Sequence, residues 1–398
     1  MEVLGHEVSG SDEVPGEGQT SVKLAGYLAE SGVEDIEALA TAWAQCSSRG
    51  PSAEPFLQPY WFSAFLQSFS AGGRAVLVTA RRGRELIGVL PLVRKRAFFG
   101  VIPARTLQSL SGIHSCRFDL CAAPFQRDVA AKKMWEVLRE DDSWDVIEAL
   151  HTPDDGGFEV LSREAAKDGY RTASWPTLRS PYLELSEVVD DPFRNCPRRY
   201  ANARSRLKSY YKKLETYGTI STTTLQEFDT GFFNSFLEIE AAGWKGKNGG
   251  AIGLNPAAIQ FYRSALQSAG RAGHLRLHAL NVNGTPIAME IGLQMNKRFY
   301  SPKVTYDENF SKCSPGQLLM RATLGELVRD GFLYYDFLGA KARHKLVWAS
   351  KVRAHSHRYI FRPSVSGRLH HALVSRVAPP LKKLKHAIYG DPQNEKMS

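Results

Sequence analysis

The stretch that decides the fold is CSPGQLLMRATLGELVRDGFLYYDF, residues 313–337. Its apolar residues first recur with the spacing of a helix that buries one face, and the end of the stretch reads as a strand. We predict that the helix begins at Ser314 and Pro315, because serine suits the residue before a helix and proline suits the first turn. Gln317 follows Ser314 by three residues, which predicts a capping box.

A helix that begins in this way can bind an anion. Its first amides have no partner within the helix, and the helix dipole adds positive charge at the same end. Gly316 has no Cβ, so another group can approach the backbone closely. The stretch therefore predicts either a phosphate site or simply a well-capped helix. Neither a Walker A loop nor a G-x-G-x-x-G motif occurs in the chain.

The segments that precede this stretch predict an α+β arrangement. A basic helix at residues 198–217 leads to a strand, two helices and then three strands between residues 275 and 310. Asn283 and Gly284 predict the hairpin turn between the first two of these strands. An antiparallel meander followed by a helix and a last strand is typical of an α+β domain.

The first half of the chain shares this outline. We predict helices at residues 32–47 and 55–69, a β-hairpin that turns at Arg82 and Gly83, and a buried strand that includes residues 144–153. No repeat is visible at the level of single residues, so a duplication is an expectation about structure alone.

The chain of 398 residues carries a net charge of +10, which favours an anionic ligand, a nucleic acid or a membrane surface as partner. The basic residues form two clusters in the sequence. One lies between Arg358 and Lys385, and the other comprises Arg198, Arg199, Arg204, Arg206, Lys208, Lys212 and Lys213.

The five cysteines show no spacing of metal ligands, so we predict no metal site and reduced thiols in a cytoplasmic protein. The acidic start of the chain lacks the basic and apolar regions of a signal peptide, and we interpret residues 1–22 as a disordered leader. No apolar run is long enough to predict a membrane-spanning helix.

Three segments carry a resemblance to a known family. They are EIEAAGWKGKNGGAI at residues 238–252, CSPGQLLMRATLGELVRDGFLYYDFLGA at residues 313–340, and KLVWAS at residues 345–350. Together they resemble the GNAT superfamily of N-acetyltransferases, and within it the FemAB-like branch associated with cellulose and exopolysaccharide biosynthesis.

The resemblance implies an α+β fold of two tandem acetyltransferase-like domains, with mixed, mostly antiparallel sheets flanked by helices. We place the leader at 1–22, a degenerate first domain at 23–185, the acetyltransferase domain at 186–365, and a basic amphipathic tail at 366–398. The resemblance also implies transfer of an acyl group from acetyl-CoA, or from another acyl-CoA, to an amine. The acceptor would be a polysaccharide or cell-envelope precursor.

The resemblance also implies which residues bind the pyrophosphate of coenzyme A. The superfamily uses a helix N-terminus for this purpose. The usual loop of the superfamily contains more than one glycine, whereas this chain has only one there. The residues carried over are Ser314, Pro315, Gly316, Gln317 and Leu318.

Three carboxylates are candidate catalytic groups for acyl transfer, which needs a base for the amine. Glu290 lies on a central strand, where burial would raise its pKa, or else it faces solvent. Glu240 precedes Trp244 and Lys245 by one helical turn, so it is either a base or part of a helix-end salt bridge. Asp336 is expected to be buried with a lysine partner, which favours a structural role.

Substrate contacts are predicted at four residues. Trp244 and Lys245 belong to the Trp-Lys-Gly motif, and Lys345 and Trp348 belong to the Lys-x-x-Trp motif. The second pair is expected to close the site or to hold an anionic or sugar substrate.

Rival interpretations remain open. FemAB relatives that use aminoacyl-tRNA offer a second donor, although this chain lacks a long heptad run. The same fold could instead bind a partner without turnover. The tail predicts two short amphipathic helices on either side of Pro379 and Pro380, which would contact an anionic membrane or pack on the domain. We do not expect a nucleic-acid-binding module, because the chain does not show the aromatic–basic interleaving of a known module.

Overall fold

The computed structural model describes residues 23–50, 53–70, 73–99, 102–185 and 201–377. The chain divides into two compact units. The first unit contains residues 1–66, 70–178 and 354–398, and the second contains residues 67–69 and 179–353. The predicted leader, Arg198 and Arg199, and the lysine-rich part of the tail lie outside the described residues.

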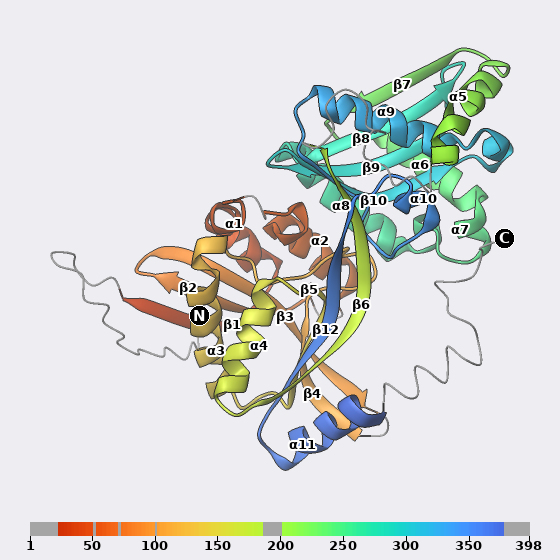
Figure 1. Ribbon diagram of the computed structural model, residues 1–398. Helices are drawn as coiled ribbons and strands as arrows, with labels where there is room; N and C mark the ends of the chain where they lie inside the picture. Colours follow the sequence, from red (N-terminus) through yellow and green to blue (C-terminus); the bar gives the residue numbers. More distant parts are fainter. Residues whose placement is uncertain (1–22, 51–52, 71–72, 100–101, 186–200, 378–398) are drawn as a thin grey trace. The chain divides into compact units, whose positions relative to one another are not determined.

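The first unit is a sheet flanked by helices (Figure 1). Its strands pair in the order β1-β2-β3-β4-β5-β12, and all of these pairs are antiparallel except β4 with β5. The elements in chain order are β1 (Leu24–Ser31), α1 (Val33–Ser47), η1 (Pro55–Leu57), α2 (Pro59–Phe69), β2 (Ala75–Arg82), β3 (Glu85–Phe99), β4 (Ile102–Ser109), η2 (Pro124–Gln126), α3 (Arg127–Glu140), β5 (Val146–Pro153), α4 (Gly157–Lys167), β6 (Arg171–Glu184), β12 (Lys351–Phe361), α11 (Val365–Ala372) and η7 (Leu373–Val377).

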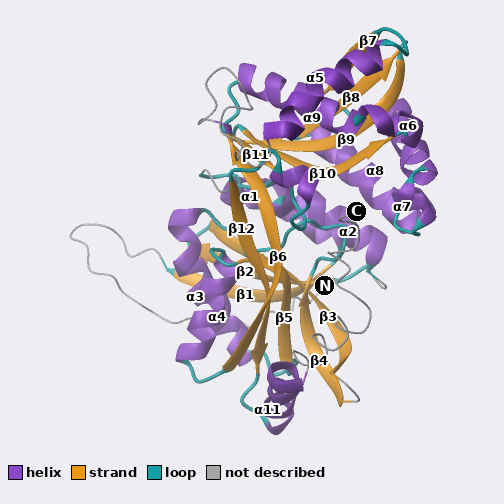
Figure 2. Cartoon of the chain, turned by 45° about the vertical axis from the view of Figure 1, so that its right-hand side comes forward, coloured by secondary structure: helices purple, strands orange, loops and turns teal. Residues whose placement is uncertain are grey.

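The second unit has the same kind of sheet (Figure 2). Its strands pair in the order β6-β11-β10-β9-β8-β7, and only β10 with β11 is parallel. Its elements are the end of β6, α5 (Ala201–Glu215), β7 (Ile220–Leu225), α6 (Thr230–Ala242), α7 (Trp244–Lys247), η5 (Ile252–Leu254), α8 (Pro256–Arg271), β8 (Leu275–Val282), β9 (Thr285–Met295), β10 (Arg298–Tyr306), η6 (Glu308–Cys313), α9 (Pro315–Arg329), β11 (Tyr334–Asp336), α10 (Arg343–Leu346) and the start of β12.

Each unit therefore contains an antiparallel meander, then a helix, then a strand that is parallel to the last strand of the meander. In the first unit this series is β2-β3-β4-α3-β5, and in the second it is β8-β9-β10-α9-β11. In both units the parallel pairing covers only three residue pairs. The predicted α+β class and the shared outline of the two halves are confirmed.

Local signals in the sequence match the turns and helix ends. Asn283 and Gly284 have φ values of 49° and 80°, as expected for the two central residues of a tight hairpin turn between β8 and β9. Gly83 turns the chain between β2 and β3 with a φ of 59°. The predicted helix of the opening stretch is α9, and the predicted strand after it is β11.

In each unit, the strand beside the parallel strand is distant from it in the sequence. In the first unit β12 pairs with β5, from His355 opposite Pro153 to Phe361 opposite Val146. In the second unit the end of β6 pairs with β11, from Tyr334 opposite Glu184 to Asp336 opposite Tyr182. The two units are thus built from stretches that interleave along the chain.

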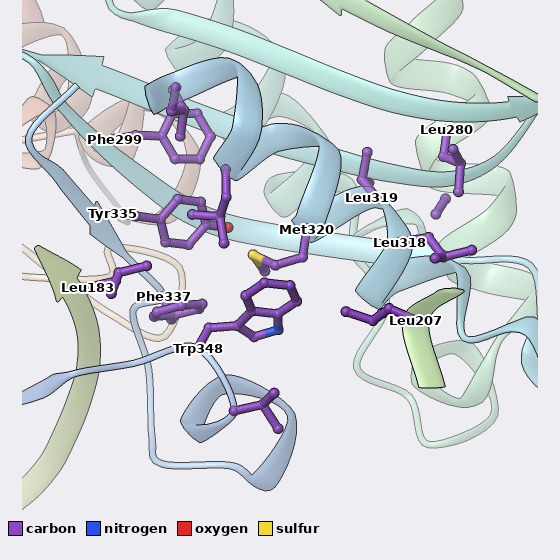
Figure 3. Close-up of a cluster of buried hydrophobic side chains, with 14 of the residues drawn as sticks. Leu183, Leu207, Leu280, Phe299, Leu318, Leu319, Met320, Tyr335, Phe337 and Trp348 are labelled. Atoms are coloured by element: carbon purple, nitrogen blue, oxygen red, sulfur yellow. The ribbon is translucent and has the colours of Figure 1, made fainter. Parts of the chain in front are cut away.

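The core of the second unit surrounds Trp348 (Figure 3). Trp348 is fully buried and lies beside Met320 and Phe337, while Leu318 in the first turn of α9 lies near Leu207 of α5. Burial of these apolar side chains stabilises the contact between α9, α5 and the chain after β11. The beginning of α9 is consequently held in place from two sides.

Candidate functional site

The start of α9 differs from the predicted capping box. Ser314 adopts a left-handed conformation with φ 47° and ψ 54°, and its side chain makes no capping hydrogen bond. A residue before a helix normally has an extended conformation, which points its side chain at the first amides. The amides of Gln317 and Leu318 instead donate to the Ser314 carbonyl oxygen, at 2.9 and 3.2 Å. The prediction of a capping box is therefore wrong, although α9 begins at the predicted residue.

The side chain of Gln317 ties the start of α9 to the Lys-x-x-Trp segment. Its Oε1 accepts a hydrogen bond from Trp348 Nε1 at 2.8 Å, and its Nε2 donates to the His344 carbonyl at 3.4 Å. Lys345 Nζ donates to the carbonyl of Leu338 at 2.7 Å. The structure thus brings the predicted phosphate-binding residues together with Lys345 and Trp348.

The edge of β10 that faces β11 opens at a bulge. The two strands pair only from Arg298 to Tyr300, and the register of β10 shifts between Tyr300 and Lys303. Pro302 lies inside this shift, where a residue without an amide N–H is tolerated. Beyond Tyr300, no strand in the described part of the chain pairs with this edge.

Lys245 and Glu240 lie at this open edge. Asp307 N donates to Ile287 O, so Asp307 is a hydrogen-bonded position of the antiparallel ladder between β10 and β9. Hydrogen-bonded positions alternate along a strand, so the N–H and C=O of Val304, three residues earlier, point away from β9. Lys245 Nζ donates to Val304 O at 2.9 Å and to Glu240 Oε1 at 2.9 Å. Glu240 Oε2 also accepts from Ile252 N at 2.8 Å. The ion pair of Glu240 and Lys245 is the salt bridge at a helix end that the sequence offers as one interpretation.

Trp244 is separated from Glu240 by a break in the helix. α6 ends at Ala242, and α7 begins at Trp244. The Trp244 side chain is half exposed, at 51%, and its amide donates to Glu308 Oε1 at 2.7 Å. Lys247 forms an ion pair with the same carboxylate. This segment offers an exposed aromatic ring beside charged groups.

Asp336 holds the turn that follows β11. Its Oδ1 accepts from Leu338 N at 2.8 Å, and its Oδ2 accepts from the Tyr334 hydroxyl at 3.2 Å. Leu338 and Gly339 both have positive φ values, of 50° and 59°. A carboxylate that accepts from the amide two residues later stabilises such a turn. These partners favour the structural role that the sequence suggests for Asp336.

Glu290 is buried on β9 beneath α9. Its carboxylate accepts hydrogen bonds from the hydroxyls of Ser301, Thr323 and Tyr335, which come from β10, α9 and β11. His278 lies opposite it on β8, with Nδ1 at 3.6 Å from Glu290 Oε2. Glu290 therefore connects four elements of the second unit.

Burial shifts the pKa of each titratable group in this network. It raises the pKa of Glu290, although the three hydroxyl donors oppose the rise. It also raises the pKa of Tyr335 well above its usual value, and the neighbouring Glu290 carboxylate adds to this effect. Burial lowers the pKa of His278 to about 4, so this imidazole is neutral at pH 7.

The raised pKa of Glu290 predicts how stability depends on pH. The folded state holds the proton more tightly than the unfolded state, so the free energy of unfolding falls as pH rises from the unfolded pKa, about 4.3, through the folded value. The Glu290→Gln variant has no such proton, so its stability relative to wild type should increase between pH 5 and pH 8. Urea denaturation at both pH values measures this difference. Glu215→Gln, at an exposed position of α5, is the control, and parallel curves for Glu290→Gln and wild type would contradict the prediction.

Asp336 lies at the turn after β11 and Trp244 at the start of α7, and the structure groups the other predicted residues into three places. The start of α9 lies with Lys345 and Trp348, the Glu240–Lys245 pair lies at the edge of β10, and Glu290 lies in the core under α9. Sequence reasoning did not identify the hydroxyl donors around Glu290 or the bulge at Pro302. The proline within the strand pattern of residues 298–306 was the available signal for the bulge.

The described residues contain neither a candidate metal site nor a helix that could span a membrane. No group of three or more His, Cys, Asp and Glu side chains among them has an arrangement that could hold a metal ion. Within the same residues, every helix is too short or too polar to cross a membrane.

Comparisons with known proteins agree with this geometry. Residues 201–346 match the family described as Acetyltransferase (GNAT) domain. The solved structure of FemX has a TM-score of 0.56 and 12% identity, over 88% of this chain and 98% of that chain. A tandem GNAT protein from the clavulanic acid biosynthesis pathway has a TM-score of 0.45 and 14% identity, over 85% and 99%. No curated protein sequence matches the chain.

The second unit is therefore a GNAT domain, the fold of acyltransferases that in general use an acyl-CoA donor. Over the chain as a whole, the likeness to FemX shows a similar fold.

Proposed function

We propose that this protein transfers an acetyl group from acetyl-CoA to an amine of a polysaccharide or cell-envelope precursor. The observation that carries the proposal is that the start of α9 lies next to the open edge of β10. The start of α9 follows β10 after the six-residue 3₁₀ helix η6, and the open edge of β10 ends at Tyr306, close to Gly316. One ligand can therefore contact both a helix N-terminus and an unpaired strand.

The pyrophosphate of the donor is proposed to bind at Ser314–Leu318. Gly316 leaves room there, because a Cβ at this position would meet nothing closer than Tyr306 Cδ1, at 3.7 Å. The partial positive charge of the helix N-terminus favours a phosphate. Lys345 and the neighbouring Arg343 on α10 add positive charge beside the first turn of α9.

The pantetheine arm is proposed to follow the open edge of β10 toward Pro302. Its amide groups have the same hydrogen-bonding groups as a peptide, so they can pair with the exposed backbone of a strand. The carbonyl of Val304 points to this edge but accepts a hydrogen bond from Lys245. Lys245 would therefore either move away or bind the donor directly. The ion pair with Glu240 holds the Lys245 ammonium at the open edge of β10.

The reaction forms a bond between the amine nitrogen and the acyl carbon. The carbon–sulfur bond breaks, the amine loses a proton, and the thiolate gains one. Glu240, Glu290 and Asp336 are each 1% exposed or less. Direct abstraction of a proton by any of them requires the substrate or water to reach an enclosed carboxylate. We therefore assign most of the rate enhancement to orientation of the two substrates, and we keep Glu290 as the candidate base.

The acceptor is proposed to be a sugar amine because of the exposed ring of Trp244. Trp244 directly precedes Lys245 in the chain, and the Lys245 ammonium reaches the open edge of β10. The exposed side chains of Arg206, Lys208, Lys212 and Lys213 on α5 favour a second candidate, an aminoacyl-tRNA donor in place of acyl-CoA, because they offer charge for a long polyanion.

Calorimetric titration of the purified protein with acetyl-CoA tests the proposed donor. We expect a dissociation constant in the micromolar range, and free coenzyme A should compete, since most of the proposed contacts involve the shared phosphates and pantetheine. A folded protein that does not bind acetyl-CoA would overturn the donor assignment. Binding of aminoacyl-tRNA by that protein would then favour the second candidate.

A further inference from the structure

A protruding part of the first unit exposes apolar side chains. The hairpin of β3 and β4 carries Phe98 near its turn, and this side chain is 70% exposed. α11 exposes Val365 at 81% and Leu369 at 47%. These two residues are four positions apart, so they lie on the same side of the helix. Exposed apolar residues that gather in one place indicate an interaction surface.

The two elements lie together at one end of the unit. α11 packs against β4, and Figures 1 and 2 both show α11 beside the end of the β3–β4 hairpin. The buried cluster beneath α11 includes Ala104 and Val374, and Ala104 is only two residues from the start of β4. Phe361 and His371 are also in ring contact there, with centroids 5.3 Å apart. The hairpin tip and α11 are therefore held together by a common core. Ala97 pairs with Ala104, so Phe98 lies on the face of the hairpin opposite to α11, and the two elements share only this end of the unit. We call the exposed residues at this end the hairpin–α11 surface: Phe98, Val365, Leu369, Lys95, Arg96 and Arg368.

The charged residues of the hairpin–α11 surface are mainly basic. Arg96 and Arg368 are exposed, and neither forms an ion pair with a carboxylate of the described residues. Lys95 is also exposed and donates to Gln108. Two of the acidic residues nearby are paired, Asp145 with Arg105 and Asp141 with Arg94, and a third, Asp142, is exposed.

The pairing of Arg96 with Arg105 is unfavourable in isolation. These residues lie directly opposite each other on β3 and β4, which brings two positive charges onto the same face. Asp145 compensates the charge of Arg105 and leaves the charge of Arg96 uncompensated. A negatively charged partner would remove this cost.

The chain continues from this surface into a basic segment. η7 follows α11 directly, and the sequence after residue 377 contains Lys382, Lys383 and Lys385. The basic charge of the surface therefore continues into the sequence that follows it. Exposed apolar residues among cations are typical of proteins that lie on an anionic lipid surface, with the apolar groups among the acyl chains and the cations at the headgroups.

We propose that the hairpin–α11 surface docks on an anionic lipid bilayer. Phe98, Val365 and Leu369 enter the interface, and Lys95, Arg96 and Arg368 contact the headgroups. A nucleic acid would use the same cations but would leave the two aliphatic side chains of α11 without a role. This inference does not depend on the proposed acyl transfer, because it concerns residues of the first unit only.

Co-sedimentation with vesicles tests this surface. The full chain should bind vesicles of phosphatidylcholine that contain phosphatidylglycerol, bind pure phosphatidylcholine at least about tenfold less, and lose binding in high salt. The double variant Val365→Glu and Leu369→Glu should reduce binding about tenfold or more. Ile113→Glu is the matched control, because Ile113 is 92% exposed in a loop of the same unit, and it should bind as wild type does.

Two further proteins make the result decisive. Phe98→Ser tests the hairpin independently, and circular dichroism checks that every variant is folded. A chain that ends at residue 377 separates this surface from the basic segment after it and should retain measurable binding. The proposal is overturned if wild type does not bind the vesicles, if only the shortened chain loses binding, or if wild type binds an RNA duplex but not the vesicles.

Discussion

Replacing Gly316 by tryptophan should weaken the binding of acetyl-CoA by about 100-fold or more, which corresponds to about 2.7 kcal/mol. The indole would occupy the space at the first turn of α9, where a Cβ meets only Tyr306 at 3.7 Å. A phosphate could then no longer approach the helix N-terminus, and the favourable interaction with its dipole would be lost. Calorimetric titration measures the change in the dissociation constant.

Gly325 provides the control for this experiment. It lies in the same helix, and a Cβ there would meet only Arg329 Nη1, at 3.7 Å. Gly325→Trp therefore makes the same change in the same helix, away from the predicted site, and should bind acetyl-CoA as wild type does. Both substitutions remove a helical glycine, so neither is expected to weaken α9 itself. Equal affinities for the two variants would exclude the start of α9 as the donor site.

A chain that ends at Ser350 should fail to fold its first unit. It lacks β12, which pairs with β5 and buries Tyr359, Ile360 and Phe361. Full burial of each such side chain contributes about 1.5–3 kcal/mol, so the loss is similar to the whole stability of a typical domain, about 5–15 kcal/mol. We expect the shortened protein to be insoluble, or to lose its cooperative thermal transition in calorimetry.

The matched protein for this comparison ends at residue 377. It retains β12, α11 and η7 and lacks only residues outside the described part of the chain. It should unfold at nearly the temperature of the full chain. A soluble, cooperatively folded protein that ends at Ser350 would show that β5 does not need β12.

Local sequence signals were sufficient where the structure depends on neighbouring residues. Pro315 begins α9, and Asn283-Gly284 makes the turn between β8 and β9, because each residue has a backbone preference that acts within one turn. The order of the three segments that resemble the GNAT superfamily is also a property of the sequence alone. It led to the correct fold class and to the GNAT domain that matches residues 201–346.

The surroundings of the candidate side chains depended on contacts between distant residues. Alternation along β9 shows that Glu290 and Met289 face opposite sides, but it does not show that Ser301, Thr323 and Tyr335 enclose the carboxylate. The expected capping by Ser314 failed for a similar reason. η6 leads into α9 through a left-handed residue, and Gln317 is drawn instead to Trp348, 31 residues further along the chain.

The sequence by itself determined the helix that begins at Pro315, the meander before it, and the residues that bear the family resemblance. Only the tertiary structure decided that β12 lies beside β5 and that the end of β6 lies beside β11. The reason is physical. A strand offers the same backbone hydrogen bonds to any partner, so its neighbour is selected by the buried side chains that fit together after the chain has folded.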